Sequence, residues 1–567
     1  IKIVGKNELV LENILLGDVW ICSGQSNMEW SVMNSDNAPE EIDNANFPQI
    51  RLLKIAHNFQ LYPALDVPET EWNICTPENI PSFSAVGYFF GRNIHIETGI
   101  PIGLISTNWG GTNIEAWTSR DYITRYDVFL KKLKTIEDFD EESFRQKQMD
   151  ALKSFIEDFQ LNPENPVKED WTAMEVDYSL WKEVEVPGVW ESRGLPGIDG
   201  TVWYRKEFEL PAGISEKGVT IYLGKIDDTD ETWVNGVKVG GINNQYNAER
   251  IYQVSPEVLK DGKNVISVRI EDCQGGGGFS SGKTELKIES GTYTQALAGT
   301  WKYKLTAEKL FYSPLNPMNP NEVPSSLFNG MINPLLNLAV KGAIWYQGES
   351  NAGRAYQYRE LMPLMIQNWR DKWGQPGMPF FMVQLANYMP AVPDPAESSW
   401  AELREAQLMT AATMENVGMA VIIDIGEADD IHPRNKQDVG SRLALSALKI
   451  AYGREIVYQG PLYESVEFEG NKANITFSNN GSGLIAKDKY GYVKGFAIAG
   501  EDKKFYWAKA KIANGKVVVS SENVSRPVAV RYAWAENPDD ANLYNKEGLP
   551  ASPFRTDDWK GITYGVE

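Results

Sequence analysis

Residues 21–30 read ICSGQSNMEW and place one serine, Ser26, among small and amide residues directly after a strand-like apolar run. A serine hydroxyl attacks an acyl carbon when a general base takes its proton and hydrogen-bond donors stabilise the oxyanion that forms. A Gly-x-Ser turn by itself is also typical of an ordinary turn. Whether Ser26 is a nucleophile therefore depends on the base, the donors and the orienting acid that the rest of the chain supplies.

The segment GEADDIHPRN contains the candidate base, His432. Asp429 stands three residues before it, and from a loop that spacing lets a carboxylate reach imidazole Nδ1 while Nε2 faces outward. Asp430 is adjacent and Glu349 lies in another polar loop, so the orienting acid stays open between these carboxylates. A pair of Ser26 and His432 without any carboxylate is a further alternative.

Two more polar segments follow strand-like runs. The first, STNWGGTNIEAW, contains Gly110 and Gly111, and paired glycines let a backbone N–H come close to a substrate oxygen. The second, IWYQGESNAG, brings Gln347, Glu349 and Asn351 together in one loop. A nucleophile, a base, an acid and preorganised donors are the groups that acyl transfer requires. Together the motifs predict a serine esterase.

The elements that must position these motifs are those of an α/β layer structure. Apolar runs predict five buried parallel strands, and apolar residues at helical spacing predict helices at 84–97 and 439–450. In doubly wound sheets of this kind, ligands bind beyond the carboxyl ends of the strands. Because each motif lies just past a predicted strand, we expect the motifs to converge. The predicted strands are residues 18–22, 102–106, 342–346, 380–384 and 420–424.

The chain between residues 171 and 288 has a different pattern. Short alternating runs are separated by Asn-Gly, Asp-Gly and polyglycine turns, which is typical of an all-β sandwich. We therefore predict a discontinuous catalytic domain interrupted by an insertion. The predicted parts are residues 1–135 and 295–455 for the catalytic domain, 136–164 for a helical connector, 165–292 for the inserted β-sandwich and 456–567 for a C-terminal β-domain.

Composition limits the possible partners. With 55 Lys and Arg against 77 Asp and Glu, the formal net charge is −22, which disfavours nucleic acid and anionic membrane surfaces. No apolar run has the length of a membrane span. Three scattered Cys and three His do not follow a metal-ligand spacing, so we expect no metal and no cofactor.

The motifs GQSNM, NWGGTNIEAW, WYQGESN and DxxHP together resemble those of the SGNH (GDSL-like) hydrolases, and more closely those of the sialate O-acetylesterases. The resemblance covers residues 16–452, with the insertion interrupting it. It implies a three-layer αβα sandwich with a parallel sheet, no metal, and removal of O-acetyl groups from sialic acids.

The resemblance also implies roles for individual residues. Ser26 matches the nucleophile and His432 the general base. The backbone N–H groups of Ser26 and of a glycine in the pair Gly110–Gly111 match oxyanion donors. The third donor of the superfamily is usually an asparagine; in this chain the side-chain amide of Gln347 is assigned to that role, with Asn351 as the alternative. Asp429 ranks first as the orienting acid.

The substrate is less closely specified than the reaction. The motifs indicate acetyl transfer, so an acetylesterase for another glycan, such as acetylated xylan or pectin, is an alternative. A catalytically silent carbohydrate-binding protein is a second alternative, which Ser26 and His432 together oppose. A sialic acid carboxylate favours a cationic partner, for which Arg404 is a candidate.

Two further expectations concern the insertion and the location of the protein. The segments VPGVW, DGTVWYRKEF and DETWVNG resemble the galactose-binding-like jelly-roll domain of family 2 glycosidases, which either shapes a substrate entrance or serves as a spacer. The strand-like run at the first residue, which is not Met, indicates a trimmed signal peptide or an earlier β-segment. We therefore expect a periplasmic or secreted protein.

Overall fold

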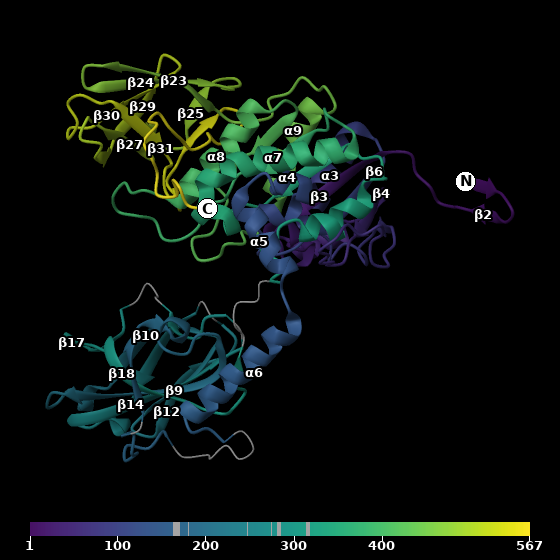
Figure 1. Ribbon diagram of the computed structural model, residues 1–567. Helices are drawn as coiled ribbons and strands as arrows, with labels where there is room; N and C mark the ends of the chain where they lie inside the picture. Colours follow the sequence, from purple (N-terminus) through teal and green to yellow (C-terminus); the bar gives the residue numbers. More distant parts are fainter. Residues whose placement is uncertain (163–170, 180, 246–247, 274, 281–284, 313–317) are drawn as a thin grey trace. The chain divides into compact units, whose positions relative to one another are not determined.

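The computed structural model describes residues 1–567 except 163–170, 180, 246–247, 274, 281–284 and 313–317 (Figure 1). The chain forms two compact units. One consists of Ile1–Ile136 and Met318–Glu567, and the other is Glu137–Pro317. Within the described residues, no helix has the length and apolar character needed to cross a membrane.

A seven-stranded sheet lies at the centre of the first unit, in the order β22-β21-β20-β3-β6-β4-β5. Neighbouring strands are parallel from β22 to β4, and only the edge strand β5 pairs antiparallel. The predicted α/β fold class with a parallel sheet is confirmed. The strands are β3 (Asp18–Gly24), β4 (Phe47–Lys54), β5 (Asn73–Cys75), β6 (Ile102–Asn108), β20 (Gly342–Tyr346), β21 (Phe380–Val383) and β22 (Val417–Ala420).

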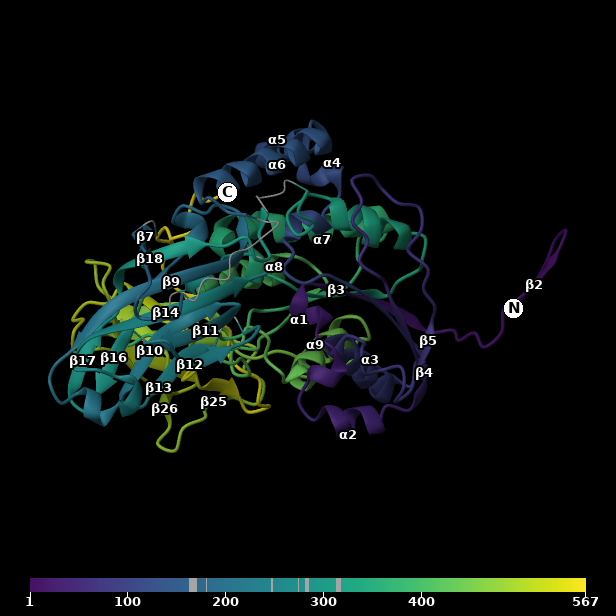
Figure 2. The same ribbon diagram turned by 90° about the horizontal axis from the view of Figure 1, so that it is seen from below.

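Helices cover both faces of this sheet (Figure 2). Alternate residues of β3 face opposite cores: Ile21 belongs to the core with α7 (Ala355–Trp373) and α8 (Ser399–Thr413). Trp20 and Cys22 belong to the core with α3 (Ala85–Thr98) and α9 (Lys436–Ile450). Side chains that alternate across a strand therefore produce the three-layer αβα sandwich.

The main helices begin where capping residues satisfy free backbone N–H groups. Ser84 Oγ accepts from Gly87 N (3.1 Å) at the start of α3, and Ser398 Oγ accepts from Ala401 N (3.0 Å) at the start of α8. The remaining helices are α1 (Ser26–Glu29), α2 (Ala38–Asp43), α4 (Arg120–Ile123), α5 (Asp127–Glu137) and α6 (Glu141–Asp158).

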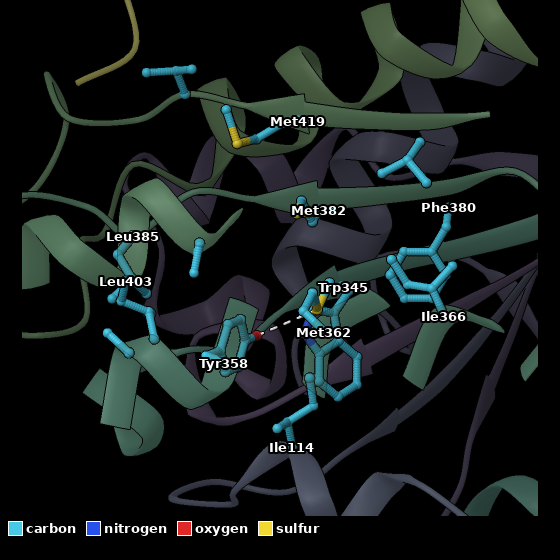
Figure 3. Close-up of a cluster of buried hydrophobic side chains, with 14 of the residues drawn as sticks. Ile114, Trp345, Tyr358, Met362, Ile366, Phe380, Met382, Leu385, Leu403 and Met419 are labelled. Carbon is cyan, nitrogen blue, oxygen red and sulfur yellow. Dashed lines mark hydrogen bonds between the residues drawn. The ribbon is translucent and has the colours of Figure 1, made fainter. Parts of the chain in front are cut away.

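The core between the sheet and α7 is rich in aromatic residues and methionine (Figure 3). Trp345 of β20 and Phe380 of β21 are fully buried and pack with Met362 and Ile366 of α7. The Trp345 and Trp369 rings form an edge-to-face pair with centroids 5.8 Å apart. This packing fixes β20, whose carboxyl end carries one of the polar loops.

Three strands of the sheet, β22, β4 and the short edge strand β5, differ from the sequence prediction. The strand expected at 420–424 is β22, which ends at Ala420, and the apolar residues after it are buried without continuing the strand. A continuous apolar run reports burial but does not fix where pairing stops. β4 was not predicted, because Gln49 and Arg51 interrupt its apolar pattern.

The second unit is a β-sandwich around its own core. One sheet has the order β17-β16-β10-β15-β8 with β13 beside β10, and the other has the order β12-β11-β14-β9-β18-β7 with β19 beside β9. The strands are β7 (Lys182–Val186), β8 (Gly188–Val189), β9 (Ile198–Leu210), β10 (Val219–Asp227), β11 (Thr229–Val234), β12 (Val237–Ile242), β13 (Glu249–Val254), β14 (Gly262–Asp272), β15 (Gly278–Ser280), β16 (Lys287–Ser290), β17 (Tyr293–Ala296), β18 (Gly299–Leu305) and β19 (Phe311–Tyr312).

The expected return to the catalytic domain at residue 295 is wrong. β18 pairs with β7 and β9 of the sandwich, and β19 also pairs with β9. Trp301, Tyr303 and Leu305 alternate into the sandwich core, which is the strand pattern that the sequence interpretation assigned to the other domain. The predicted boundary between 164 and 165 lies outside the described residues.

The strands after residue 456 are β23 (Leu462–Glu469), β24 (Lys472–Ser478), β25 (Leu484–Ala486), β26 (Tyr492–Val493), β27 (Phe496–Ala499), β28 (Phe505–Trp507), β29 (Lys509–Ala513), β30 (Lys516–Ser520), β31 (Ala529–Tyr532), β32 (Leu543–Asn545) and β33 (Phe554–Arg555). Several of their buried residues, including Phe477 and Phe496, share one core with α7 and α8. A separate C-terminal domain beginning at 456 therefore stays a prediction.

Candidate active site

Ser26 lies directly beyond the carboxyl end of the central strand β3. Gln25 N donates to Tyr346 O (3.0 Å), so the turn before the serine is held against the end of β20. Gly24 has φ +142, and a Cβ at this position would lie 2.2 Å from Tyr346 O. Only glycine permits this approach of the two strand ends. Ser26 then begins the short helix α1 at the edge where ligands bind in such sheets.

His432 faces Ser26 from the loop between β22 and α9. Its Nε2 lies 2.9 Å from Ser26 Oγ, which is hydrogen-bond distance. The imidazole stacks on the indole of Trp30, with centroids 5.1 Å apart and planes 13° from parallel. α9 begins only at Lys436, because Asn435 Oδ1 accepts from Asp438 N (3.1 Å), so His432 lies before the helix rather than in its first turn. The predicted base is therefore next to the predicted nucleophile.

The environment of His432 favours the neutral imidazole. Burial lowers the pKa of His432, and the nearby Lys436 ammonium lowers this pKa further, while the Asp430 carboxylate raises it. The net direction of the pKa is downward from the ordinary 6.5. A neutral ring can accept the serine proton, so the electrostatics suit a general base.

The carboxylate that lies against the imidazole belongs to Asp430. Its Oδ1 is 3.4 Å from His432 Nδ1 and accepts from His432 N (2.8 Å). The hydrogen bond from His432 N holds the Asp430 side chain toward the histidine two positions later. Asp430 is therefore a candidate orienting acid in the structure, and the first rank given to Asp429 stays a prediction.

Glu349, the second-ranked acid, contacts the nucleophile turn instead of the imidazole. Its Oε1 accepts from Asn27 Nδ2 (2.7 Å). The residue is partly buried, its Oε2 is shielded from solvent, and burial raises the pKa of the carboxyl group. Glu349 therefore contacts the residue next to Ser26.

The glycine pair lies beside Ser26, but one of its N–H groups is engaged. A Cβ at Gly110 would lie 3.3 Å from Ser26 Cβ, so this backbone is in contact with the nucleophile. Gly110 N donates to Glu29 Oε2 (2.8 Å). An oxyanion that used this donor would have to displace the Glu29 carboxylate. Gly111 has φ +73, and a Cβ there would face Asn321 Nδ2 at 2.9 Å.

The amides of Gln347 and Asn351 are structural, which contradicts their assignment as oxyanion donors. Gln347 Nε2 donates to Thr112 O (3.0 Å) and to Asn351 Oδ1 (2.6 Å), and both amide hydrogens are thereby used. Asn351 Nδ2 donates to Glu115 Oε2 (3.1 Å). Both side chains are buried and connect the loops after β6 and β20. Position past a strand end does not reveal which way a side chain points.

Arg404 is also structural and does not bind substrate. Its guanidinium is fully buried and donates to four backbone carbonyls, at Leu385, Ala386, Ala535 and Glu536 (2.6–2.8 Å). Burial lowers its pKa to about 9. The interpretation as a partner for a sialic acid carboxylate is therefore wrong.

Sequence reasoning missed several residues around Ser26. Glu29 Oε1 lies 2.9 Å from His57 Nε2, and the His57 ring stacks on Trp109 with centroids 4.1 Å apart. Lys436 donates to Asn27, the residue after the nucleophile. Glu29 and Asn27 stand within the same quoted motif as Ser26, and that proximity in sequence was the available signal.

Comparisons with known proteins agree with this fold. The family of sialic acid-specific acetylesterases, a carbohydrate esterase family, matches residues 16–145 and 318–449. The second all-β domain of β-galactosidase matches residues 192–275. A solved carbohydrate acetylesterase from Xanthomonas citri is 30% identical, with a TM-score of 0.62, over 98% of this chain and 84% of the other.

Curated relatives point in the same direction. The sialate O-acetylesterase of Mus musculus is 25% identical over 96% of this chain and 78% of that protein. The Homo sapiens enzyme of the same name is 23% identical over 96% of this chain and 76% of that protein. The fold and these relatives define the protein as a carbohydrate acetylesterase. The chain belongs to the sialic acid-specific acetylesterase family of carbohydrate esterases, which confirms the family predicted from the motifs.

Proposed function

We propose that the protein hydrolyses O-acetyl esters of sialic acids through an acyl-enzyme formed on Ser26. The observation that carries the mechanism is the 2.9 Å between Ser26 Oγ and His432 Nε2. The acetylesterase family supports the acetyl group, and the curated relatives named sialate O-acetylesterase support the sugar. Within this proposal the protein acts in the periplasm or outside the cell.

The reaction proceeds in two acyl transfers. His432 Nε2 takes the proton of Ser26 Oγ, the oxygen attacks the acetyl carbonyl carbon, and the carbon–oxygen bond to the sugar breaks. The imidazolium returns its proton to the leaving sugar oxygen. In the second half a water loses a proton to His432 and attacks the acetyl carbon. The bond from that carbon to Ser26 Oγ then breaks, the imidazolium returns the proton to Oγ, and acetic acid leaves as acetate after ionising in solution.

The surrounding groups stabilise charge during both steps. Asp430 faces the imidazolium that forms, which lowers the free energy of that charge. The backbone N–H of Ser26 at the start of α1 is the first oxyanion donor of the proposal. The glycine pair Gly110–Gly111 supplies the second donor, with Glu29 giving up Gly110 N–H when substrate binds.

The substrate is tested by comparing acetate release from O-acetylated sialic acid and from acetylated xylan. The proposal expects a higher kcat/KM on the sialic acid. A higher kcat/KM on acetylated xylan would support an acetylesterase whose substrate is a glycan other than sialic acid. Acetate release from neither, and from no small chromogenic acetyl ester, would favour a silent carbohydrate-binding protein.

The pH dependence of kcat/KM should report the lowered pKa of His432. Because burial and Lys436 lower this pKa, the base is already neutral at pH values somewhat below 6.5. Activity should therefore persist below pH 6.5 and be lost only as the pH falls through the pKa of the folded protein. We would measure kcat/KM on a neutral acetyl ester between pH 4 and 8. An acidic limb at or above 6.5 would contradict the assigned environment of His432.

Arg434 is the candidate cation for a sialic acid carboxylate. It stands two residues after His432 and its side chain is exposed, with no ion pair recorded among the described residues. Arg434→Gln should raise KM on O-acetylated sialic acid about fivefold, since one exposed charged contact is worth at most about 1 kcal/mol. The KM on a neutral acetyl ester serves as the control. Equal changes on both substrates would exclude carboxylate recognition by this residue.

A further inference from the structure

Lys436 lies fully buried beneath the nucleophile turn. It is the first residue of α9, and its Nζ donates to Asn27 Oδ1 (2.6 Å). The ammonium also lies 5.7 Å from the centroid of the Trp30 ring and 5.4 Å from that of Tyr346. Burying an ammonium is costly unless it is hydrogen-bonded and paired with opposite charge. Its contacts therefore decide what it contributes.

Asn27 connects Lys436 to three segments of the site. It follows Ser26 directly, and it is completely buried. Its Nδ2 donates to Glu349 Oε1 (2.7 Å) and to Ile431 O (3.0 Å), the carbonyl just before His432. One amide thus joins the turn after β3, the loop after β20 and the loop that carries the base.

Glu349 is the opposite charge in this group. One of its oxygens accepts from Asn27, and its Oε2 is buried with no hydrogen bond among the described residues. Asn27 therefore lies between the carboxylate of Glu349 and the buried ammonium of Lys436, with one N–H toward the first and its oxygen toward the second. This arrangement fixes the orientation of the amide. A flipped amide would turn its oxygen toward the Glu349 carboxylate and its N–H groups toward the Lys436 ammonium, and both contacts would be repulsive.

We propose that Lys436 is a positioning residue for Ser26 and His432, acting through the side chain of Asn27. The inference rests on the proposed Ser26–His432 mechanism. Lys436 holds Asn27 Oδ1, and Asn27 in turn holds the main chain of Ile431, so the ammonium fixes the separation of nucleophile and base. Because this separation decides whether the serine proton can be transferred, the effect should appear in kcat.

The charge of Lys436 has a second effect, on the imidazole. Burial lowers the pKa of Lys436 to about 7, and the carboxylates that face it, Glu349, Asp430 and Glu427, oppose this by raising the pKa. When charged, the ammonium lowers the pKa of His432. Loss of the cation should therefore raise the pKa of His432 and move the acidic limb of kcat/KM to higher pH.

The test compares two single variants. Lys436→Gln keeps a donor for Asn27 Oδ1 and removes the charge, whereas Lys436→Met removes both. We expect Lys436→Met to lose tenfold to a hundredfold in kcat, as a small misplacement of reacting groups does. Lys436→Gln should lose less in kcat. In both variants the acidic limb of the kcat/KM profile should move to higher pH by roughly half a pH unit or more. Lys449→Met, near the other end of α9 and paired with Glu455, is the matched control and should leave kcat and the limb unchanged.

A charge-neutral double variant separates positioning from neutralisation. Lys436→Met leaves Glu349 buried without its counter-charge, so its melting temperature should fall. Lys436→Met with Glu349→Gln removes both charges and should recover that temperature. If kcat and the acidic limb stay changed in the double variant, Lys436 acts as proposed.

Two results would overturn the inference. Full recovery of kcat and of the limb in the double variant would show that Lys436 only neutralises Glu349. If both single variants keep the kcat and the acidic limb of the parent protein, Lys436 has no role in the reaction. Ser26→Ala keeps the two ideas distinguishable: an active Ser26→Ala rejects the proposed mechanism whatever Lys436 does, and an inactive one leaves Lys436 to be judged by its own variants.

Discussion

Ser26→Ala should abolish acetyl-ester turnover while the protein keeps its fold. The hydroxyl is the atom that attacks, and its recorded partner is His432 Nε2 at 2.9 Å. Loss of a serine nucleophile lowers kcat by on the order of 10⁴- to 10⁶-fold, and the remainder comes from binding and oxyanion donors. Because removing one oxygen opens little space, we expect the thermal melt to change only slightly. The measurement is kcat on a chromogenic acetyl ester, with the melt recorded in parallel.

Ser31→Ala is the matched control for this variant. Ser31 lies five residues further along the same segment, and its Oγ accepts from Asn34 Nδ2 (3.0 Å). It should keep the parent kcat within about threefold, as substitutions away from special contacts usually do. Labelling with a serine-reactive fluorophosphonate gives a second readout: one label on the peptide containing Ser26 in the parent, and none on it in Ser26→Ala. A folded Ser26→Ala protein within tenfold of parent activity would reject the nucleophile.

The strand-end positions of the site residues could be predicted because they follow from simple patterns. Apolar runs report buried parallel strands, and the carboxyl ends of such strands share one edge. The predictions for β3, β6 and β20 therefore placed Ser26, Gly110 and the polar loop after Tyr346 at the same edge. The order and direction of the strands were therefore enough to predict that these residues lie close together.

The directions of side chains could not be predicted in the same way. Gln347 and Asn351 lie at the right edge, but their amides turn into the structure and bond each other. Asp430 turns toward the imidazole because His432 N–H holds its carboxylate, and no spacing rule contains that hydrogen bond. Arg404 stands on a helix with polar neighbours, and it is completely buried with its guanidinium bonded to the carbonyls of Ala535 and Glu536, in the loop after β31. These outcomes depend on tertiary contacts.

The domain boundary failed for a different reason. Residues 299–305 alternate like a strand of either unit, and only pairing with β7 and β9 assigns them to the sandwich. Strand patterns specify a buried face without naming the partner. Sequence periodicity is therefore a weaker guide to the end of an inserted domain than to its existence.

Asp430→Asn should lower kcat with little change in KM. The substitution keeps the shape, so the amide oxygen of the introduced side chain can still accept from His432 N, but the negative charge facing Nδ1 is lost. A carboxylate in this position stabilises the imidazolium that forms during attack, and the corresponding change in serine proteases costs about 10⁴-fold. Asp430 is 37% exposed and 3.4 Å from Nδ1, so we expect a smaller loss, roughly 10²- to 10³-fold.

A second readout distinguishes this role from a structural one. Asp430 raises the pKa of His432, so removing its charge should lower that pKa and move the acidic limb of kcat/KM to lower pH. This direction is opposite to the one expected for loss of Lys436, because the two groups carry opposite charges. Asp429→Asn is the matched control, one position earlier in the same loop, and should lose less than tenfold. A larger loss in Asp429→Asn would return the orienting role to Asp429, and losses below tenfold in both variants would indicate that Ser26 and His432 act without a carboxylate.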